Sequence, residues 1–211
     1  MDFLDPAIEH YALQHSQPES NILQKINRQT HAQVLMPRML SGALQGNVLA
    51  TFSRMIKPMN VLEIGTYTGY SAICLAQGVQ AQGKVYTIDI NEELEARVRA
   101  YFEEAQMTTK INYYIGNALH IIPTLDVLFD IVFIDADKKN YAAYYDLVFD
   151  KVNKGGYIIA DNVLWSGKVL HSPMDEDTAS IDAFNKKVHN DKRVRNLLMP
   201  IRDGLMIAQK I

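Results

Sequence analysis

The sequence has one cysteine, no marked excess of either charge and no long apolar run. Cys74 cannot form a disulfide within the chain, and its place on the apolar side of a helical pattern predicts a buried thiol. A net charge of −3 over 211 residues gives no electrostatic reason to bind nucleic acid. No apolar run approaches the ~20 residues of a membrane span, and residues 1–9 carry acids where a signal peptide is basic. We therefore expect a cytoplasmic protein with no nucleic-acid or membrane partner.

Several common catalytic signatures are also missing. Ser41, Ser71 and Ser166 do not lie in a Gly-x-Ser-x-Gly turn, which argues against a serine hydrolase. The Gly-x-Gly-x-x-Gly fingerprint of nicotinamide-binding enzymes is absent. The six histidines lack the spacing of metal ligands. Acids, glycines and a lysine are left as the candidates for chemistry.

The first part of the chain, residues 1–57, has helical periodicity. Leu44, Val48 and Phe52 recur at helical spacing after a break at residues 36–42. Pro58 is expected to end this helix, because proline cannot continue the backbone hydrogen bonds. We expect one domain, residues 1–211, in which this helical part covers a site built by the core, residues 58–211.

From residue 60 onward, predicted strands alternate with predicted helices. This alternation predicts an α/β fold with a mostly parallel sheet and helices on both faces. Near the end of the chain two strands flank the short turn at residues 202–204, so they must be antiparallel, and Gly155-Gly156 predicts another turn. The predicted strands are 61–64, 84–90, 111–115, 130–134, 157–160, 195–201 and 205–210, and the predicted helices are 70–79, 92–105, 118–122, 141–152 and 175–189.

The stretch from Val61 to Ser71 organises the predicted core. A short strand runs into Gly65 and Gly69, and a helical pattern follows at once. Such a turn presents free backbone N–H groups to a polar ligand at the helix N-terminus. Glu63 just before the turn would repel a phosphate, so the ligand is expected to carry hydroxyls or a positive charge. Asp89, at the end of the next strand and about 20 residues past the turn, has the position of an acid that binds ribose hydroxyls.

Two further strand ends carry oxygen ligands. Asp135 follows one buried strand, and Asp161-Asn162 follows the next. Because the carboxyl ends of parallel strands meet at one edge of the sheet, these side chains are expected to lie together. Each motif has a plain structural alternative, since Asp135 can cap a helix and Asp161-Asn162 can form a turn. Their combination favours a magnesium site, because Mg²⁺ prefers oxygen ligands.

Lys138 follows Asp135 by about one helical turn and can reach the same site. A nearby divalent cation favours its neutral amine, which can act as a general base. Lys139 is expected to be an ordinary surface lysine. The spacing of Met36 and Met39 favours packing within the core or loop, and soft walls for a flat substrate are the alternative.

The combination of motifs resembles the cation-dependent O-methyltransferases of the catechol and caffeoyl-coenzyme-A type, in the plant and bacterial branch. The resemblance covers roughly residue 35 to the end of the chain. It rests on residues 63–71, 85–89, 116–119, 133–141, 160–167 and 203–204.

This resemblance implies a Rossmann-like fold with a seven-stranded sheet, an S-adenosylmethionine cofactor and a homodimer. It also implies roles for individual residues. Lys138 is the implied base, Trp165 an aromatic wall for the substrate and Met39 a second substrate contact. The implied metal ligands, for Mg²⁺ or another cation such as Mn²⁺ or Ca²⁺, are Asp135, Asp161 and Asn162. The implied cofactor residues are Ser41, Glu63, Gly65, Thr66, Ser71, Asp89 and Ala118, with Asp135 shared between the two sites.

The expected reaction is methyl transfer to a hydroxyl of a phenolic, catechol-like or caffeoyl-type acceptor. Two vicinal oxygens that chelate one cation lose a proton more easily, and the oxyanion then attacks the sulfonium methyl. Two alternatives remain open: a nicotinamide-dependent oxidoreductase, and a protein that binds S-adenosylmethionine without catalysis. The oxidoreductase would require a glycine fingerprint that this sequence lacks. A protein that only binds S-adenosylmethionine would not need Lys138 or the predicted metal ligands.

Overall fold

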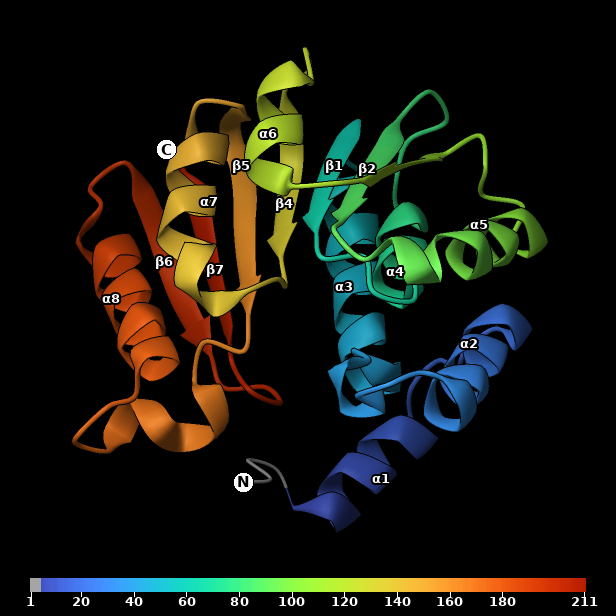
Figure 1. Cartoon of the computed structure of the whole chain (residues 1–211), viewed down its shortest axis with the longest axis horizontal. Helices are drawn as coiled ribbons and strands as arrows, with labels where there is room; N and C mark the ends of the chain where they lie inside the picture. Colours follow the sequence, from blue (N-terminus) through green and yellow to red (C-terminus); the bar gives the residue numbers. More distant parts are fainter. Residues whose placement is uncertain (1–4) are drawn as a thin grey trace.

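The computed structural model describes residues 5–211 and contains a seven-stranded sheet with helices on both faces (Figure 1). The strand order is β3-β2-β1-β4-β5-β7-β6. The strands are β1 (Asn60–Ile64), β2 (Lys84–Asp89), β3 (Ile111–Ile115), β4 (Phe129–Ile134), β5 (Val152–Asp161), β6 (Val194–Met199) and β7 (Leu205–Lys210). Only β7 runs antiparallel to its neighbours β5 and β6, which confirms the predicted sheet.

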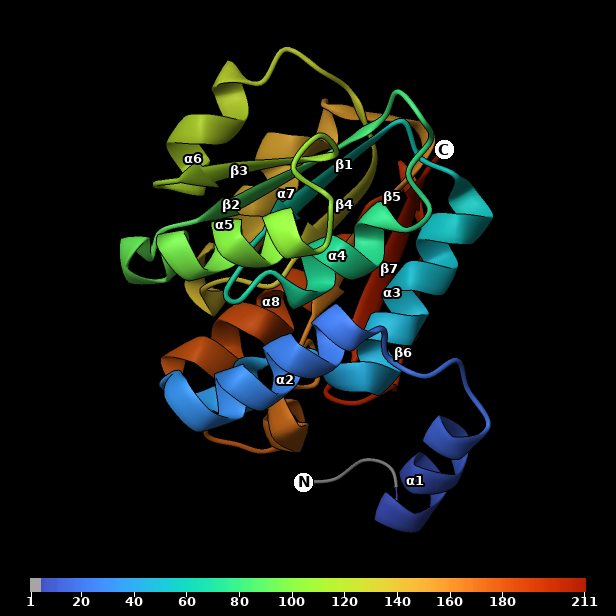
Figure 2. The same ribbon diagram turned by 90° about the vertical axis from the view of Figure 1, so that its right-hand side faces the viewer.

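Helices flank the sheet in two groups (Figures 1 and 2). The α-helices are α1 (Pro6–Gln14), α2 (Asn21–Gln33), α3 (Gly42–Ile56), α4 (Tyr70–Ala76), α5 (Glu95–Glu104), α6 (Ala118–Ile121), α7 (Tyr141–Phe149) and α8 (Glu176–Asn190). The 3-10 helices are η1 (Pro37–Met39), η2 (Glu92–Leu94), η3 (Ile122–Thr124), η4 (Lys138–Asn140) and η5 (Trp165–Leu170). None of these helices, within residues 5–211, is long and apolar enough to cross a membrane.

Side-chain alternation along the strands divides the core into two layers. On β1, Leu62 packs with α6, α7 and α8, while its neighbour Val61 packs with α2 to α5 on the other face. Successive side chains of a strand point to opposite faces, so a strand buried on both sides must be apolar nearly throughout. Cys74 lies in the second layer and is buried, as predicted.

The N-terminal region is helical, as predicted, and the part of that prediction on residues 1–4 lies outside the described residues. The helix α3 ends at Ile56, where Lys57 adopts a left-handed conformation before Pro58. Figure 2 shows α1 at the periphery, and it has no buried residue.

The predicted turn at Gly155-Gly156 is wrong, because β5 runs through both glycines. The pairing of β5 with β4 changes register there, between Phe129 and Ile131. A Cβ at Gly156 would lie 3.1 Å from the Asp130 carbonyl oxygen, and Gly155 has a φ of +83°. The two glycines therefore permit a bulge inside a strand, where the pattern suggested a chain reversal. The predicted helix 141–152 also stops earlier, at Phe149, since Val152 already belongs to β5.

Candidate active site

The glycine turn lies where β1 ends, between β2 and β4. Gly65 has a φ of +102°, and a Cβ on it would lie 1.8 Å from the carbonyl oxygen of Asp135. No other residue fits this position, because the backbone of the neighbouring strand end passes directly against it. The Gly65 N–H donates to the Ile88 carbonyl at 2.9 Å. The turn is thus held against both neighbouring strands, at the sheet edge where ligands of α/β proteins bind.

Asp89 ends β2, as predicted, and holds the glycine turn in place. One carboxylate oxygen accepts the Tyr67 N–H at 2.6 Å and the other accepts the Asn91 N–H at 2.8 Å. The Gly116 N–H donates to the Asp89 carbonyl at 2.8 Å, so the end of β3 lies beside it. Ala118 follows at the start of α6 and is 7 % exposed. Asp89 and Ala118 therefore lie at the same edge, next to the turn.

Glu63 is completely buried beneath the turn. Burial raises its pKa to about 8; hydrogen bonds from Ser71 and Thr87 oppose this shift, and the negative charges of Asp135 and Asp89 add to it. The Thr87 hydroxyl also lies 2.5 Å from that of Thr66, which links the turn to β2. Glu63 is therefore held largely neutral, and a positive charge brought close to it would favour its anion. Thr87 was not predicted from the sequence, because nothing in a strand pattern marks which threonine faces an acid.

A second cluster forms around Lys138 in η4, between the ends of β4 and β5. Its Nζ lies 3.0 Å from Asn162 Oδ1, 3.4 Å from Asp135 Oδ1 and 2.5 Å from the Tyr141 hydroxyl. Only 9 % of the Lys138 side chain is exposed. The structure thus brings together three of the residues predicted for the metal and the base. Lys139 is exposed and pairs with Glu176, as expected of a surface lysine.

Asp161 lies at the buried side of this cluster and is 3 % exposed. Burial raises its pKa to about 7, and the charge of Asp135 adds to the shift. Gln45 Nε2 donates to Asp161 Oδ2 at 2.6 Å, and the backbone N–H of Asn162 donates to Oδ1 at 2.7 Å. The backbone of Asn162 is left-handed, with a φ of 57°, which asparagine tolerates better than most residues.

The donor set at this cluster fits a hard cation. The charge of the Asp135 carboxylate raises the pKa of Asp161, and the amide oxygen of Asn162 belongs to the same cluster. A positive charge stabilises such an oxygen-rich site. In the structure this positive charge is the Lys138 ammonium group. Within the described residues no three His, Cys, Asp or Glu side chains gather as a metal site, so the amide of Asn162 is required to complete the set.

The two predicted substrate contacts differ in their surroundings. The Trp165 ring lies 5.7 Å from Lys138 Nζ, and the neighbouring Ser166 N–H donates to Asp203 Oδ1 at 2.5 Å. This places Trp165 beside the cluster. Met39 is 56 % exposed in η1, so of its predicted packing in the core or a loop the core alternative is wrong, and its role as a substrate contact stays a prediction.

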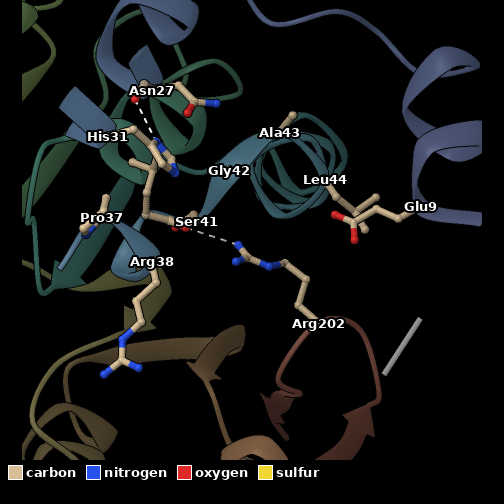
Figure 3. A pocket seen from close by; sticks show the side chains of 11 residues that line it. Glu9, Asn27, His31, Pro37, Arg38, Ser41, Gly42, Ala43, Leu44 and Arg202 are labelled. Atoms are coloured by element: carbon tan, nitrogen blue, oxygen red, sulfur yellow. Dashed lines mark hydrogen bonds between the residues drawn. The ribbon is translucent and has the colours of Figure 1, made fainter. Parts of the chain in front are cut away.

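Ser41 belongs to the N-terminal region, whereas the other predicted cofactor residues belong to the core. It is buried at the start of α3 and lines a cavity of about 290 Å³, which Figure 3 shows. Arg202, from the turn between β6 and β7, lines the same cavity and donates to Gln45 Oε1 at 3.3 Å. Gln45 and Arg202 were not predicted as site residues, because their contacts join segments far apart in the sequence.

Comparison with known proteins agrees with this arrangement. The family described as O-methyltransferase matches residues 13–211. The chain belongs to the O-methyltransferase family. Membership confirms the resemblance inferred from the sequence and removes the nicotinamide-dependent alternative.

Two relatives within this family show the extent of the similarity. The chain is 33% identical over 216 residues to "Catechol O-methyltransferase domain-containing protein 1" of Mus musculus, covering 98% of this chain and 81% of that protein. It is 33% identical over 189 residues to "Caffeoyl-CoA O-methyltransferase 5" of Nicotiana tabacum, covering 82% of this chain and 78% of that one.

Solved structures of O-methyltransferases share the whole fold. The enzyme from Bacillus cereus in complex with SAH has a TM-score of 0.90 at 27% identity, with 97% of each chain covered. The O-methyltransferase TomG from Streptomyces achromogenes, in complex with SAM, has a TM-score of 0.88 at 26% identity, covering 97% of this chain and 96% of that one.

Proposed function

We propose that this O-methyltransferase transfers a methyl group from S-adenosylmethionine to one hydroxyl of a catechol-like or caffeoyl-type phenol, with the help of a divalent cation. The observation that carries the proposal is the contact of Lys138 Nζ with both Asp135 and Asn162, at two adjacent strand ends. A methyl donor needs no such cluster for its own binding, whereas activation of an acceptor hydroxyl does. The identity of the methyl donor is supported by the two similar structures, one in complex with SAM and the other with SAH.

The donor would bind along the glycine turn. Each carboxylate oxygen of Asp89 has already accepted one backbone N–H, and each can accept a further bond from a ribose hydroxyl. Glu63, held largely neutral by burial, would become an anion when the cationic sulfonium or ammonium group of the donor approaches it. The residues expected to line the donor site are Glu63, Gly65, Thr66, Ser71, Asp89 and Ala118. Ser41 and Asp135 are expected at the edges of this site.

Asp135, Asp161 and Asn162 would hold the cation, for which Mg²⁺ is the first candidate and Mn²⁺ or Ca²⁺ are others. When bound there, a divalent cation makes a coordinated phenolic hydroxyl more acidic. A bound cation would favour the neutral amine of Lys138 over its ammonium form, and Lys138 Nζ would then take up the hydroxyl proton and pass it to water. Trp165 covers the ring of the acceptor and reduces the access of water. A low-dielectric site favours the reaction, because an anion and a sulfonium cation become two neutral products.

Product analysis tests this function. The protein is incubated with S-adenosylmethionine and either catechol or guaiacol, with Mg²⁺ or with excess EDTA, and products are identified by mass spectrometry. We expect catechol to be methylated only with Mg²⁺. We expect guaiacol to be methylated poorly, because with a single free hydroxyl it cannot chelate the cation as catechol does. Equal turnover of both phenols would argue against chelation, and binding of the donor without any product would favour the non-catalytic alternative. Light scattering of the same sample tests the homodimer that the resemblance implies.

A further inference from the structure

The cavity beside Ser41 is positively charged and lies next to the candidate active site. It is formed between the N-terminal helices and the β6–β7 turn, and its polar lining consists of Glu9, Asn27, His31, Arg38, Ser41 and Arg202. This lining contains two guanidinium groups and one carboxylate, in a chain whose net charge is −3. Such a local excess of positive charge suits an anionic ligand.

Arg202 is the residue that carries the argument. Its Nη1 donates to the Leu40 carbonyl at 3.4 Å and to Gln45 Oε1 at 3.3 Å, and both partners are neutral. Among residues 5–211, no carboxylate lies within salt-bridge distance of Arg202 or Arg38. A guanidinium has five N–H donors, so most of those on Arg202 are available to a ligand.

Figure 3 shows how the two arginines lie. The Arg202 side chain reaches from its turn toward Ser41 at the start of α3, whereas Arg38 extends from η1 in another direction. Arg202 is therefore placed to contact a ligand directly, and Arg38 contributes charge at the rim, where it is exposed. The left-handed backbone of Arg202, with a φ of 48°, aims the side chain out of the hairpin turn and across to α3.

Gln45 joins this cavity to the metal and base cluster. Its amide nitrogen donates to Asp161 at 2.6 Å, and its amide oxygen accepts from Arg202 at 3.3 Å. One glutamine side chain thus separates the Arg202 guanidinium from the carboxylate expected to hold the cation. Arg202 and Asp161 therefore bond to the same amide group, so they lie close enough for one acceptor to contact both.

We propose that the methyl acceptor carries an anionic substituent, such as a carboxylate, which Arg202 binds in this cavity while the hydroxyls lie at the Asp135, Asp161 and Asn162 cluster. This inference rests on the proposed function and narrows its substrate class. Arginine binds a carboxylate through two parallel N–H···O bonds, which also fixes the direction of the ring. The same chemistry would suit the carboxylate of the methyl donor, so a test must separate the two sources.

Matched acceptors provide the test. We compare 3,4-dihydroxybenzoate with its methyl ester in the wild type, in Arg202→Met, in Arg202→Lys and in Arg195→Met, which removes an exposed arginine at the far end of β6. In the wild type and in Arg195→Met, kcat/KM for the acid should exceed that for the ester by about 10- to 100-fold, as expected of charge-assisted hydrogen bonds. Arg202→Met should abolish this ratio through a raised KM for the acid, and Arg202→Lys should restore part of it.

Several results would overturn the inference. One is a wild type that prefers the ester or does not discriminate, and another is an Arg202→Met variant that slows acid and ester equally, as a purely structural arginine would. A loss of S-adenosylmethionine affinity in Arg202→Met, measured calorimetrically without acceptor, would assign the carboxylate to the donor instead. Quenching of the single tryptophan, Trp165, measures acceptor binding without turnover. Preferred binding of the acid without any product would therefore support the anion site while rejecting the proposed catalysis.

Discussion

Gln45 Nε2 lies 2.6 Å from Asp161 Oδ2, although 116 positions separate the two residues in the chain. Gln45 belongs to α3 in the N-terminal helical region, and Asp161 ends β5 in the sheet. The N-terminal region therefore contributes directly to the cluster of acids at the sheet edge. Because Asp161 is buried, its carboxylate depends on such a donor to remain ionised, and Gln45 lowers its pKa against the effect of burial.

Replacing Gln45 by methionine keeps the volume of the side chain and removes the donor. We expect metal-dependent turnover to fall by about 5- to 100-fold, since the loss of a hydrogen bond to a buried charged group costs about 1–3 kcal/mol. The midpoint of activation in a Mg²⁺ titration should rise by a similar factor, because the cation then binds against a more basic carboxylate. Asn47→Ala on the same helix, whose side chain bonds to the Gln17 carbonyl, is the control. Wild-type Mg²⁺ dependence in Gln45→Met would show that this contact is structural only.

Replacing Asp89 by alanine should weaken S-adenosylmethionine binding by roughly 1–3 kcal/mol, the worth of hydrogen bonds to a charged acceptor. The variant also frees the N–H groups of Tyr67 and Asn91, so its melting temperature must be measured beside its affinity. Calorimetric titration with S-adenosylmethionine gives the affinity, with Glu93→Ala as an exposed acidic control nearby. A folded Asp89→Ala protein with wild-type affinity would remove Asp89 from the donor site.

Replacing Lys138 by alanine should lower the chemical step by about 10²–10⁴-fold, the usual contribution of a positioned general base. Part of the loss should return at high pH, where the acceptor hydroxyl ionises without help. The measurement is a pH–rate profile at saturating Mg²⁺, compared with Lys139→Ala, which removes an exposed lysine next in sequence. Identical profiles for wild type and Lys138→Ala would leave activation of the acceptor to the cation alone.

Glu63 makes stability depend on pH. Its pKa is about 8 in the folded protein against an ordinary value of 4.5, so between these values the folded state keeps a proton that the unfolded chain has lost. The unfolding free energy therefore decreases as pH rises through this interval and is then constant with respect to this group. Asp161, with a pKa of about 7, acts in the same direction.

Thermal melts of the ligand-free protein at about pH 5 and about pH 9 test this dependence. The wild type should lose more stability over this interval than Glu63→Gln, which cannot ionise. Glu93→Gln, at an exposed position, should behave as the wild type. A Glu63→Gln protein with the full wild-type decrease would mean that Glu63 is ionised throughout or reaches water. Saturating S-adenosylmethionine should reduce the decrease in the wild type, since its positive charge favours the carboxylate.

Local patterns in the sequence were sufficient to predict the succession of strands and helices along the chain, the antiparallel end of the sheet and the acids at the strand ends. These features depend on local causes, namely the alternation of apolar residues along the chain and the short turn at residues 202–204. The turn predicted at Gly155-Gly156 was wrong because that prediction, too, used local information alone. A glycine pair permits either a turn or a bulge, and only the pairing of β5 with β4 decides between them.

Which side chains come into contact depends on the packing of the whole fold. The positions of Asp135, Asp161 and Asn162 at one edge follow from the parallel sheet, but the contacts of Gln45 with Asp161 and Arg202 require α3 to pack across the ends of β5 and β7. Nothing local in the sequence marks a glutamine on a helix for such a partner, because its role is set by long-range packing. The burial of Glu63 likewise follows from the layers above and below β1, and burial is what raises its pKa.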